Sequence, residues 1–392
     1  MKLLGDKLPA PRLDDLTLAA VENTVASCHD FKNRSEGFLA SNSTSKRNQK
    51  FLRRMRYETD SCIRGYATKG YYLAYANFMG GIQNSVTDAF EKNTTLKYNT
   101  LQEYEDNLKV LKMVPKQIGE IKTLLVEGAK EGITYANESI YKTMDQFEGL
   151  QVSNVEDSKF YKQFAKIRVN VHNITEEDAL RIQDEAKNVI MKEILPKMKE
   201  LQGYIFGEYQ THLRKTPGVS SLPNGQLFYQ RCIEYHTSVR DFTAQDIHKI
   251  GLEEVELLRS QAEQSAVDVG LEKTSFKDVV AHFTSKELSS FSTGNETIKA
   301  FKDTVARINP QLDQYFSKDV LTDDVYDLEV KKVPVGKSGI AYYESASFDK
   351  TRKGAFYINT QNPEYTNPIE VSALALHEGN PGENFLLLPL LL

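Results

Sequence analysis

Residues 176–212, EEDALRIQDEAKNVIMKEILPKMKELQGYIFGEYQTH, decide the fold. Their apolar side chains recur at three- and four-residue spacing, which is the period of one face of an α-helix. That face consists of Ala179, Ala186, Val189, Ile190, Ile194, Met198, Leu201 and Ile205. Thr175 is a suitable N-cap, because three acidic residues follow it in the first turn. The stretch predicts a long amphipathic helix that Pro196 should kink.

Two later segments predict helices by the same spacing. The first begins after Thr243, and the second runs from about Thr297 to Phe316 and is bent by Pro310. We expect their inner side chains to be Ile247, Ile250, Val255 and Leu258 in the first, and Ile298, Phe301, Val305, Ile308 and Leu312 in the second. Residues 67–95 and 100–145 are also predicted to be helical, so residues 10–325 form a predominantly helical region.

The pattern changes near Asp327. Residues 328–333 alternate apolar and polar side chains, as a half-buried strand does, and residues 340–343 can return as the second strand of a hairpin. Residues 355–358 predict a third short strand. Residues 368–378 then predict a buried helix whose inner side chains are Val371, Ala373, Leu374, Ala375 and Leu376.

Together these elements predict a mostly α fold with a small antiparallel β-sheet near the C-terminus. The sheet should lie within residues 326–360. We expect a helical region at 1–325 and, at 326–392, the sheet followed by the start of a further helix. Both regions should belong to one continuous domain.

The composition indicates an ordinary globular protein. Hydrophobic residues make up 40% of the 392 residues and charged residues 26%, as in most folded domains. The net charge of −5 provides no overall attraction to nucleic acid, and no apolar run is long enough to span a membrane. We therefore expect neither a nucleic-acid partner nor a transmembrane segment.

The cysteines and the N-terminus bear on the compartment. Cys28, Cys62 and Cys232 are far apart and odd in number, so buried free thiols are the simplest interpretation. Residues 1–9 lack the apolar segment of a signal peptide. Six N-glycosylation sequons exceed the roughly three expected by chance and favour a secretory origin; they begin at Asn33, Asn42, Asn93, Asn137, Asn173 and Asn295. The compartment is left open by these opposing signals.

The candidate chemistry lies in His377 and Glu378, at the end of the last predicted helix. In zinc hydrolases such a histidine binds the metal, and the adjacent glutamate takes a proton from the zinc-bound water. A short sheet beside that helix suits the same chemistry, because its edge strand can hold an extended peptide by main-chain hydrogen bonds. We predict that both residues lie next to the strands at 340–343 and 355–358.

Four stretches carry a resemblance to a known family. They are residues 221–225 with 229–237, residues 243–255, residues 342–360, and residues 377–382, which read HEGNPG. Together they resemble the zincin-like domain-of-unknown-function family 885, whose motif is His-Glu-x-x-Pro-Gly-His-His. The resemblance covers most of residues 215–382. It implies a zincin-like α+β fold and zinc-dependent hydrolysis of a peptide substrate.

The resemblance also implies roles for single residues. His377 would be a zinc ligand and Glu378 the general base. The residues near the cleft that would contact substrate are Tyr342, Tyr343, Arg352, Tyr357 and Asn359. Where the family has His-His, this chain has Glu383 and Asn384, so Glu383 is the substitute ligand to consider. The family's later zinc-binding glutamate has no counterpart in residues 1–392, which makes the predicted fold and its metal site incomplete.

Three functions remain open at this point. The chain can be an inactive member of a zinc-metallopeptidase-like hydrolase family that does not retain zinc. It can be a working metallohydrolase in which Glu383 and a distant carboxylate complete the site. It can also be a non-enzymatic helical scaffold that binds peptides or proteins in the former cleft.

Overall fold

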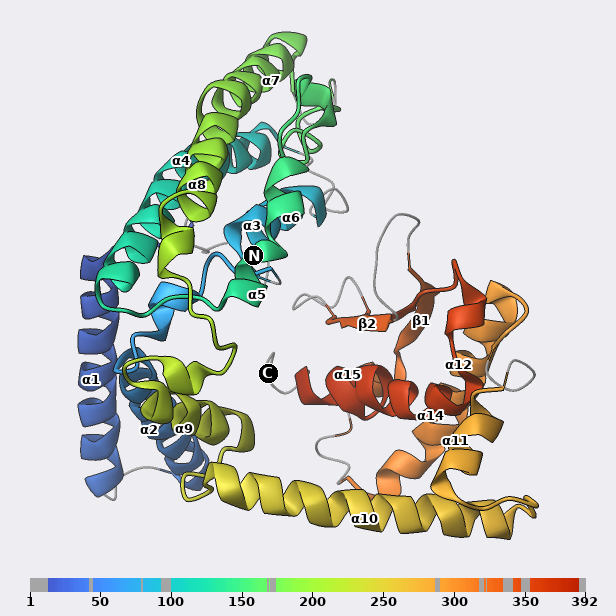
Figure 1. The fold of residues 1–392 in the computed structure, drawn as a ribbon. Coiled ribbons are helices and arrows are strands. Elements are labelled where there is room, and N and C mark those ends of the chain that lie inside the picture. The colour runs from blue at the N-terminus through green and yellow to red at the C-terminus, as the bar shows by residue number, and fades with distance from the viewer. Residues whose placement is uncertain are drawn as a thin grey trace. The chain divides into compact units, whose positions relative to one another are not determined.

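The structure is a computed structural model that describes residues 13–41, 45–78, 80–92, 100–167, 169, 174–285, 290–316, 321, 323–333, 341–346 and 353–387. The chain forms two compact units, one from Ala10 to Ile247 and one that includes His248 to Leu392. Figure 1 shows helices in the first unit, and a small sheet with its own helices in the second. The predicted boundary between residues 325 and 326 marks the change from helices to strands. The boundary between the compact units lies elsewhere, between Ile247 and His248, inside the helix Ala244–Asp268.

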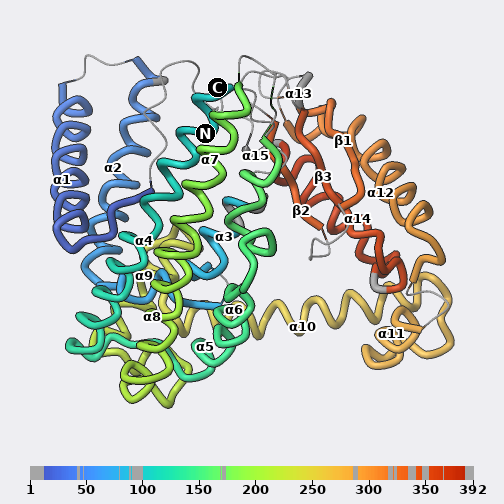
Figure 2. The backbone as a smooth tube through the Cα atoms, turned by 90° about the horizontal axis from the view of Figure 1, so that it is seen from above, coloured from blue at the N-terminus to red at the C-terminus, as the bar shows by residue number. Residues whose placement is uncertain are grey.

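Helices build the described part of the first unit (Figures 1 and 2). They are α1 (Leu18–Ala40), α2 (Lys46–Tyr66), α3 (Ile82–Lys92), α4 (Leu101–Lys130), α5 (Asn137–Tyr141), α6 (Met144–Glu148), α7 (Glu176–Val189), α8 (Leu195–Phe206) and α9 (Gly225–Thr237). Short 3₁₀ turns lie between them, including Gly70–Leu73 and Tyr209–His212. The prediction of a predominantly helical region is therefore confirmed, but residues 67–78, at the start of the segment predicted as helical at 67–95, form turns and a 3₁₀ turn rather than an α-helix.

The stretch at 176–212 is helical as predicted but is divided into parts. The Thr175 hydroxyl caps α7 by accepting a hydrogen bond from the Asp178 backbone N–H at 3.1 Å. A π-helical turn, η4 (Ile190–Ile194), joins α7 to α8, and the α-helix ends at Phe206. Pro196 explains the break, because it has no N–H and its ring crowds the carbonyl of the residue four positions earlier, which lies in η4.

The apolar face of this helix packs against α4 and forms the core of the first unit. Its fully buried side chains include Ile190, Ile194, Met198, Leu201 and Ile205, and those of α4 include Leu111, Val114 and Ile118. Ion pairs lie along the rim of the contact, with the Lys122 Nζ 2.7 Å from a Glu200 carboxylate oxygen. Exposed ion pairs contribute little to stability, so apolar burial is the main force that holds this core together.

A disulfide joins α1 to α2, which corrects the prediction of three free thiols. The Cα atoms of Cys28 and Cys62 are 6.5 Å apart across the pair of helices, and Cys232 is the free cysteine. The Lys32 Nζ and an Asp60 carboxylate oxygen form a second link at 2.7 Å. The sequence spacing could not predict this bond, because two antiparallel helices bring together residues that are far apart in the chain.

The second unit begins within a long helix and ends at the predicted site. Its elements are α10 (Ala244–Asp268), α11 (Phe276–Phe283), α12 (Gly294–Ile308), α13 (Asp323–Tyr326), β1 (Glu329–Lys332), β2 (Ala341–Glu344), β3 (Ala355–Ile358), α14 (Val371–Leu374), η10 (Ala375–Gly379, π-helical) and α15 (Gly382–Leu387). Over the ranges that the structure describes, no helix in either unit is both long and apolar enough to cross a bilayer.

The three-stranded sheet is mixed, which corrects the prediction of an antiparallel sheet. β3 lies between the other strands; it pairs with β1 in parallel and with β2 in antiparallel orientation. The predicted hairpin of residues 328–333 with 340–343 is therefore wrong, since β1 and β2 do not pair. Alternation predicts strands, but pairing order depends on which strand is buried on both faces, and β3 is the most apolar of the three.

The core of the second unit lies between the sheet and α12. The Phe301 and Phe356 rings meet edge to face with centroids 5.4 Å apart, beside buried Val371 and Ala375. α12 ends earlier than predicted, at Ile308, and a 3₁₀ turn, Asn309–Gln314, carries the chain past Pro310. Two of the residues predicted to be buried in the last helix, Ala373 and Leu376, are exposed.

The inner side predicted for α10 is also wrong. Ile250, Val255 and Leu258 are 41%, 54% and 59% exposed, and Ala266 is the buried residue of this helix. The apolar period predicts the helix correctly, but it cannot show whether another element packs on the face it defines.

Candidate functional site

His377 and Glu378 lie on η10, between α14 and α15. η10 contacts both β2 and β3, which is the neighbourhood expected from the order of elements. Gly379 ends η10 and is buried, and a Cβ atom added there would lie in van der Waals contact with Phe356 of β3 and Val305 of α12. The core of the second unit thus fixes the segment that carries the candidate residues.

A glycine turns the chain from η10 into α15. A Cβ atom at Gly382 would overlap the carbonyl oxygens of Leu376 and His377, so only glycine fits this turn without displacement. The Asn380–Pro381 peptide bond just before it is cis. The turn brings Glu383 close enough to Glu378 for their carboxylates to interact.

Glu378 is half-buried and electrostatically perturbed. Burial raises the pKa of its carboxyl above the usual value, and the Glu383 carboxylate raises it further. The His377 side chain and a hydrogen bond from the Tyr343 backbone lower the pKa, but they do not cancel the rise. Glu378 therefore keeps its proton to a higher pH than an exposed glutamate does.

A cluster of buried amides holds α15 in place. Asn384 is 1% exposed, and its amide donates to the Val325 carbonyl at 2.9 Å and to the Asn380 Oδ1 at 2.7 Å. Its own Oδ1 accepts a hydrogen bond from the Tyr343 hydroxyl at 2.8 Å. Asn380 donates to the Asn309 Oδ1 at 2.8 Å and to the Val325 carbonyl at 2.9 Å. These bonds tie α15 to β2 and α13.

The predicted substrate-contacting residues divide between the two faces of the sheet. Tyr343 reaches Asn384, whereas Tyr342 and Tyr357 are paired across β2 and β3 and stack with ring centroids 4.9 Å apart. Side chains alternate along a strand, so the stacked pair lies on the face opposite Tyr343. The Asn359 Oδ1 accepts a hydrogen bond from the Gln361 N–H at 3.0 Å. Arg352 lies outside the described residues, and the substrate roles of all five residues stay predictions.

The described residues do not fit a three-ligand zinc site. Over those ranges, no three His, Cys, Asp or Glu side chains are grouped so that they could hold a metal ion. The predicted ligands His377 and Glu383 supply one imidazole and one carboxylate. Asn384 uses its amide in the buried cluster. Catalytic zinc sites use three protein ligands, so the donor set here is too small.

Comparison with known families settles the relationship. A family model described as "Bacterial protein of unknown function (DUF885)" matches residues 2–387. The chain belongs to the DUF885 family. The match spans nearly the whole sequence, including the helical region at which no motif could be quoted. The family description assigns no activity.

A solved structure resembles this DUF885 chain in fold. It is described as "the putative lipoprotein from Colwellia psychrerythraea", and it superposes with a TM-score of 0.68 at 18% sequence identity. The match covers 79% of this chain and 53% of that one, so the present chain spans about half the length of the structure it matches. At this identity the likeness shows the fold alone. No curated protein matches the sequence.

Sequence reasoning missed the residues that fix the DUF885 site segment. Asn380 and Asn384 are four residues apart, as on one helical face, although Pro381 and Gly382 interrupt the helix between them. Two amides at this spacing, next to an apolar helix, are a signal for a buried hydrogen-bonded cluster.

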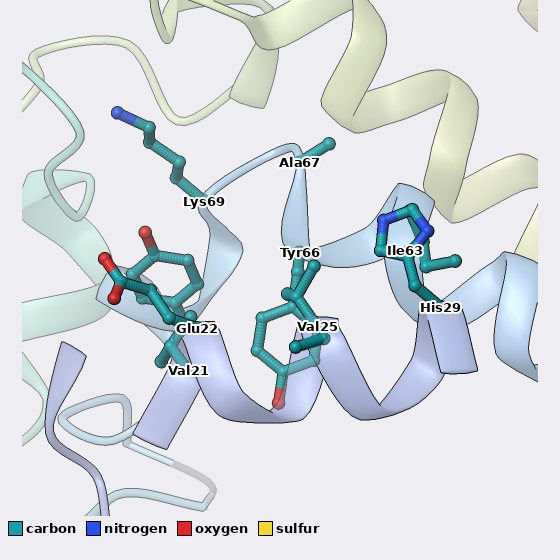
Figure 3. Close-up of a pocket in the computed structure, with 10 residues that line it drawn as sticks. Val21, Glu22, Val25, His29, Ile63, Tyr66, Ala67 and Lys69 are labelled. Atoms are coloured by element: carbon teal, nitrogen blue, oxygen red, sulfur yellow. The ribbon is translucent and has the colours of Figure 1, made fainter. Parts of the chain in front are cut away.

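The first unit contains a separate hollow between α1 and the end of α2. Its volume is about 550 Å³, and its lining is mainly apolar. In Figure 3, Val25 and Tyr66 lie near its middle, with Lys69 and His29 toward opposite ends. None of the predicted site residues lines this hollow.

Proposed function

We propose that this chain belongs to a metallopeptidase-like branch of hydrolases and does not itself hydrolyse peptides. His377 and Glu378 would be the metal-ligand and general-base positions of the ancestral site, and zinc would be its cofactor. The observation that carries the proposal is Asn384, a buried amide at the position of the motif's last histidine.

The surroundings of Glu378 support the ancestral role. The carboxyl lies against a strand of the sheet, is partly withdrawn from water, and has a raised pKa. Perturbed carboxyl groups of this kind are concentrated at catalytic sites. A peptide substrate would be placed along β2, next to this group.

The donor set supports the lack of activity. A single imidazole with one uncertain carboxylate cannot form the three-ligand cage that activates a zinc-bound water. The Glu383 carboxylate also raises the pKa of Glu378, because in the absence of a cation a nearby like charge disfavours ionisation of that carboxyl.

A peptide-cleavage assay tests the proposal. Residues 1–392 are incubated with a mixed peptide library, with and without added zinc, beside Glu378→Gln and Glu370→Gln; Glu370 is an exposed glutamate that precedes α14 and serves as the matched control. We expect no cleavage above the blank from any of the three. Cleavage that a chelator abolishes, that Glu378→Gln removes and that Glu370→Gln keeps would contradict the proposal.

The same assay separates the alternative function, a non-enzymatic scaffold. A scaffold would retain particular peptides of the library without cutting them, and zinc would not change their retention. If the chain neither retains nor cleaves peptides, the result supports the inactive hydrolase and rules out the peptide-binding scaffold.

A further inference from the structure

The α1–α2 pair carries a concentrated positive charge at the end where α1 finishes and α2 begins. Residues 46–56 contain six basic residues and no acidic one, in a chain whose net charge is −5. The exposed members are Lys46, Lys50, Arg53, Arg54 and Arg56. Lys50, Arg53 and Arg56 form no ion pair with any acidic residue that the structure describes, so their charges are available to a partner.

Large apolar side chains are exposed in the same place. Phe31, Phe38 and Phe51 are 47%, 55% and 61% exposed. The Cys28–Cys62 disulfide fixes the register of α1 and α2, which lie side by side in Figures 1 and 2. The two helices are antiparallel, so residues equally far from the disulfide, after Cys28 in α1 and before Cys62 in α2, lie at the same level. Phe38 is therefore level with Leu52, the neighbour of Phe51. We call residues 31–41 and 45–56 the hairpin end.

We propose that the hairpin end binds the surface of a membrane that contains anionic lipid. Lysine and arginine side chains are attracted to the negative surface of such a membrane within about a Debye length. Exposed phenylalanines enter the boundary between headgroups and acyl chains, where they leave water. The hairpin end supplies both groups together, and it would lie on the membrane without crossing it.

The phenylalanines favour a membrane over nucleic acid. A nucleic-acid duplex would attract the same basic residues through its phosphates, but it offers no apolar layer in which three phenylalanine rings could be buried. A patch that binds by charge alone has no use for these rings, and exposing them to water is unfavourable.

The test is flotation of residues 1–392 with lipid vesicles. We expect the protein to float with vesicles of phosphatidylglycerol mixed with phosphatidylcholine and to stay behind with phosphatidylcholine alone. Reversing two charges, Lys50→Glu with Arg53→Glu, should lower partitioning roughly tenfold or more, and high salt should lower it too. Phe38→Ser with Phe51→Ser should also weaken binding.

Matched controls keep the outcome specific. Lys277→Glu with Lys302→Glu reverses two exposed charges in the second unit, and Leu252→Ser with Leu258→Ser removes two exposed apolar side chains of α10. Both control pairs should float like the parent chain, and thermal unfolding should show all variants folded. Equal binding to phosphatidylcholine, unchanged binding of the hairpin-end variants, or binding to a DNA duplex without binding to vesicles would overturn the proposal.

Discussion

The α7–α8 helix and α10 carry similar apolar spacing, yet they have different surroundings. In α8 and η4 the predicted inner residues are fully buried against α4, whereas in α10 the corresponding residues are about half exposed. The spacing is a property of one helix, while burial needs a second element to pack on it. The comparison teaches that the pattern predicts helices well and predicts cores only where a partner element is present.

The largest expected effect comes from matched substitutions in these two helices. Leu201→Ala in α8 should lower the free energy of unfolding by about 2–5 kcal/mol, because it removes fully buried methyl groups and leaves a cavity. Leu258→Ala in α10 should change it by less than about 0.5 kcal/mol, because that side chain is already largely in water. Urea unfolding measures both. Equal losses for the two variants would show that α10 is buried in solution.

The α1–α2 pair provides an intermediate case. These helices bury few side chains completely, so apolar burial contributes little to holding them together. The disulfide between them supplies additional stability. Cys28→Ser should lower the free energy of unfolding of the first unit by about 2–4 kcal/mol, because it releases the loop between the two cysteines in the unfolded chain. Cys232→Ser, at the free cysteine, is the control and should have a small effect. A null result for Cys28→Ser under non-reducing conditions would mean that the bond is absent.

Buried polar groups extend the comparison to hydrogen bonds. Asn384→Ala should lower the free energy of unfolding of the second unit by about 1–3 kcal/mol, because it leaves the Asn380 Oδ1 and the Tyr343 hydroxyl without their buried partner. Gln264→Ala removes an exposed amide from α10 and should cost less than about 0.5 kcal/mol. If the two variants lose the same stability, the amide cluster is not packed as described.

The sequence predicted the features that depend on a single element. The helical period, the Thr175 cap and the three strands follow from local spacing. The order of elements, together with the family resemblance, predicted that the segment carrying His377 lies beside β2. Features that join distant residues were not predicted: the Cys28–Cys62 bond, the parallel β1–β3 pairing and the contact of Asn384 with Tyr343. Local patterns contain no information on which elements meet.

The smallest expected effect concerns the charge of Glu378. Its folded pKa is raised above the ordinary value of 4.5, so the folded chain binds more protons than the unfolded chain between those two values. Stability should therefore fall as pH rises through that window. Glu378→Gln should remove this decline and be the more stable protein at neutral pH, with little difference below pH 4. Thermal unfolding across pH checks it; a parallel pH dependence of the two proteins would contradict the raised pKa.

The most direct test of the central claim is the zinc content of residues 1–392. The protein is equilibrated with zinc, passed through a desalting column, and measured by mass spectrometry beside His377→Ala and Glu383→Gln. We predict that the parent chain retains far less than one equivalent and does not differ from either variant, because one imidazole and one carboxylate do not complete a site. One equivalent of zinc in the parent chain, lost in both variants, would contradict the account.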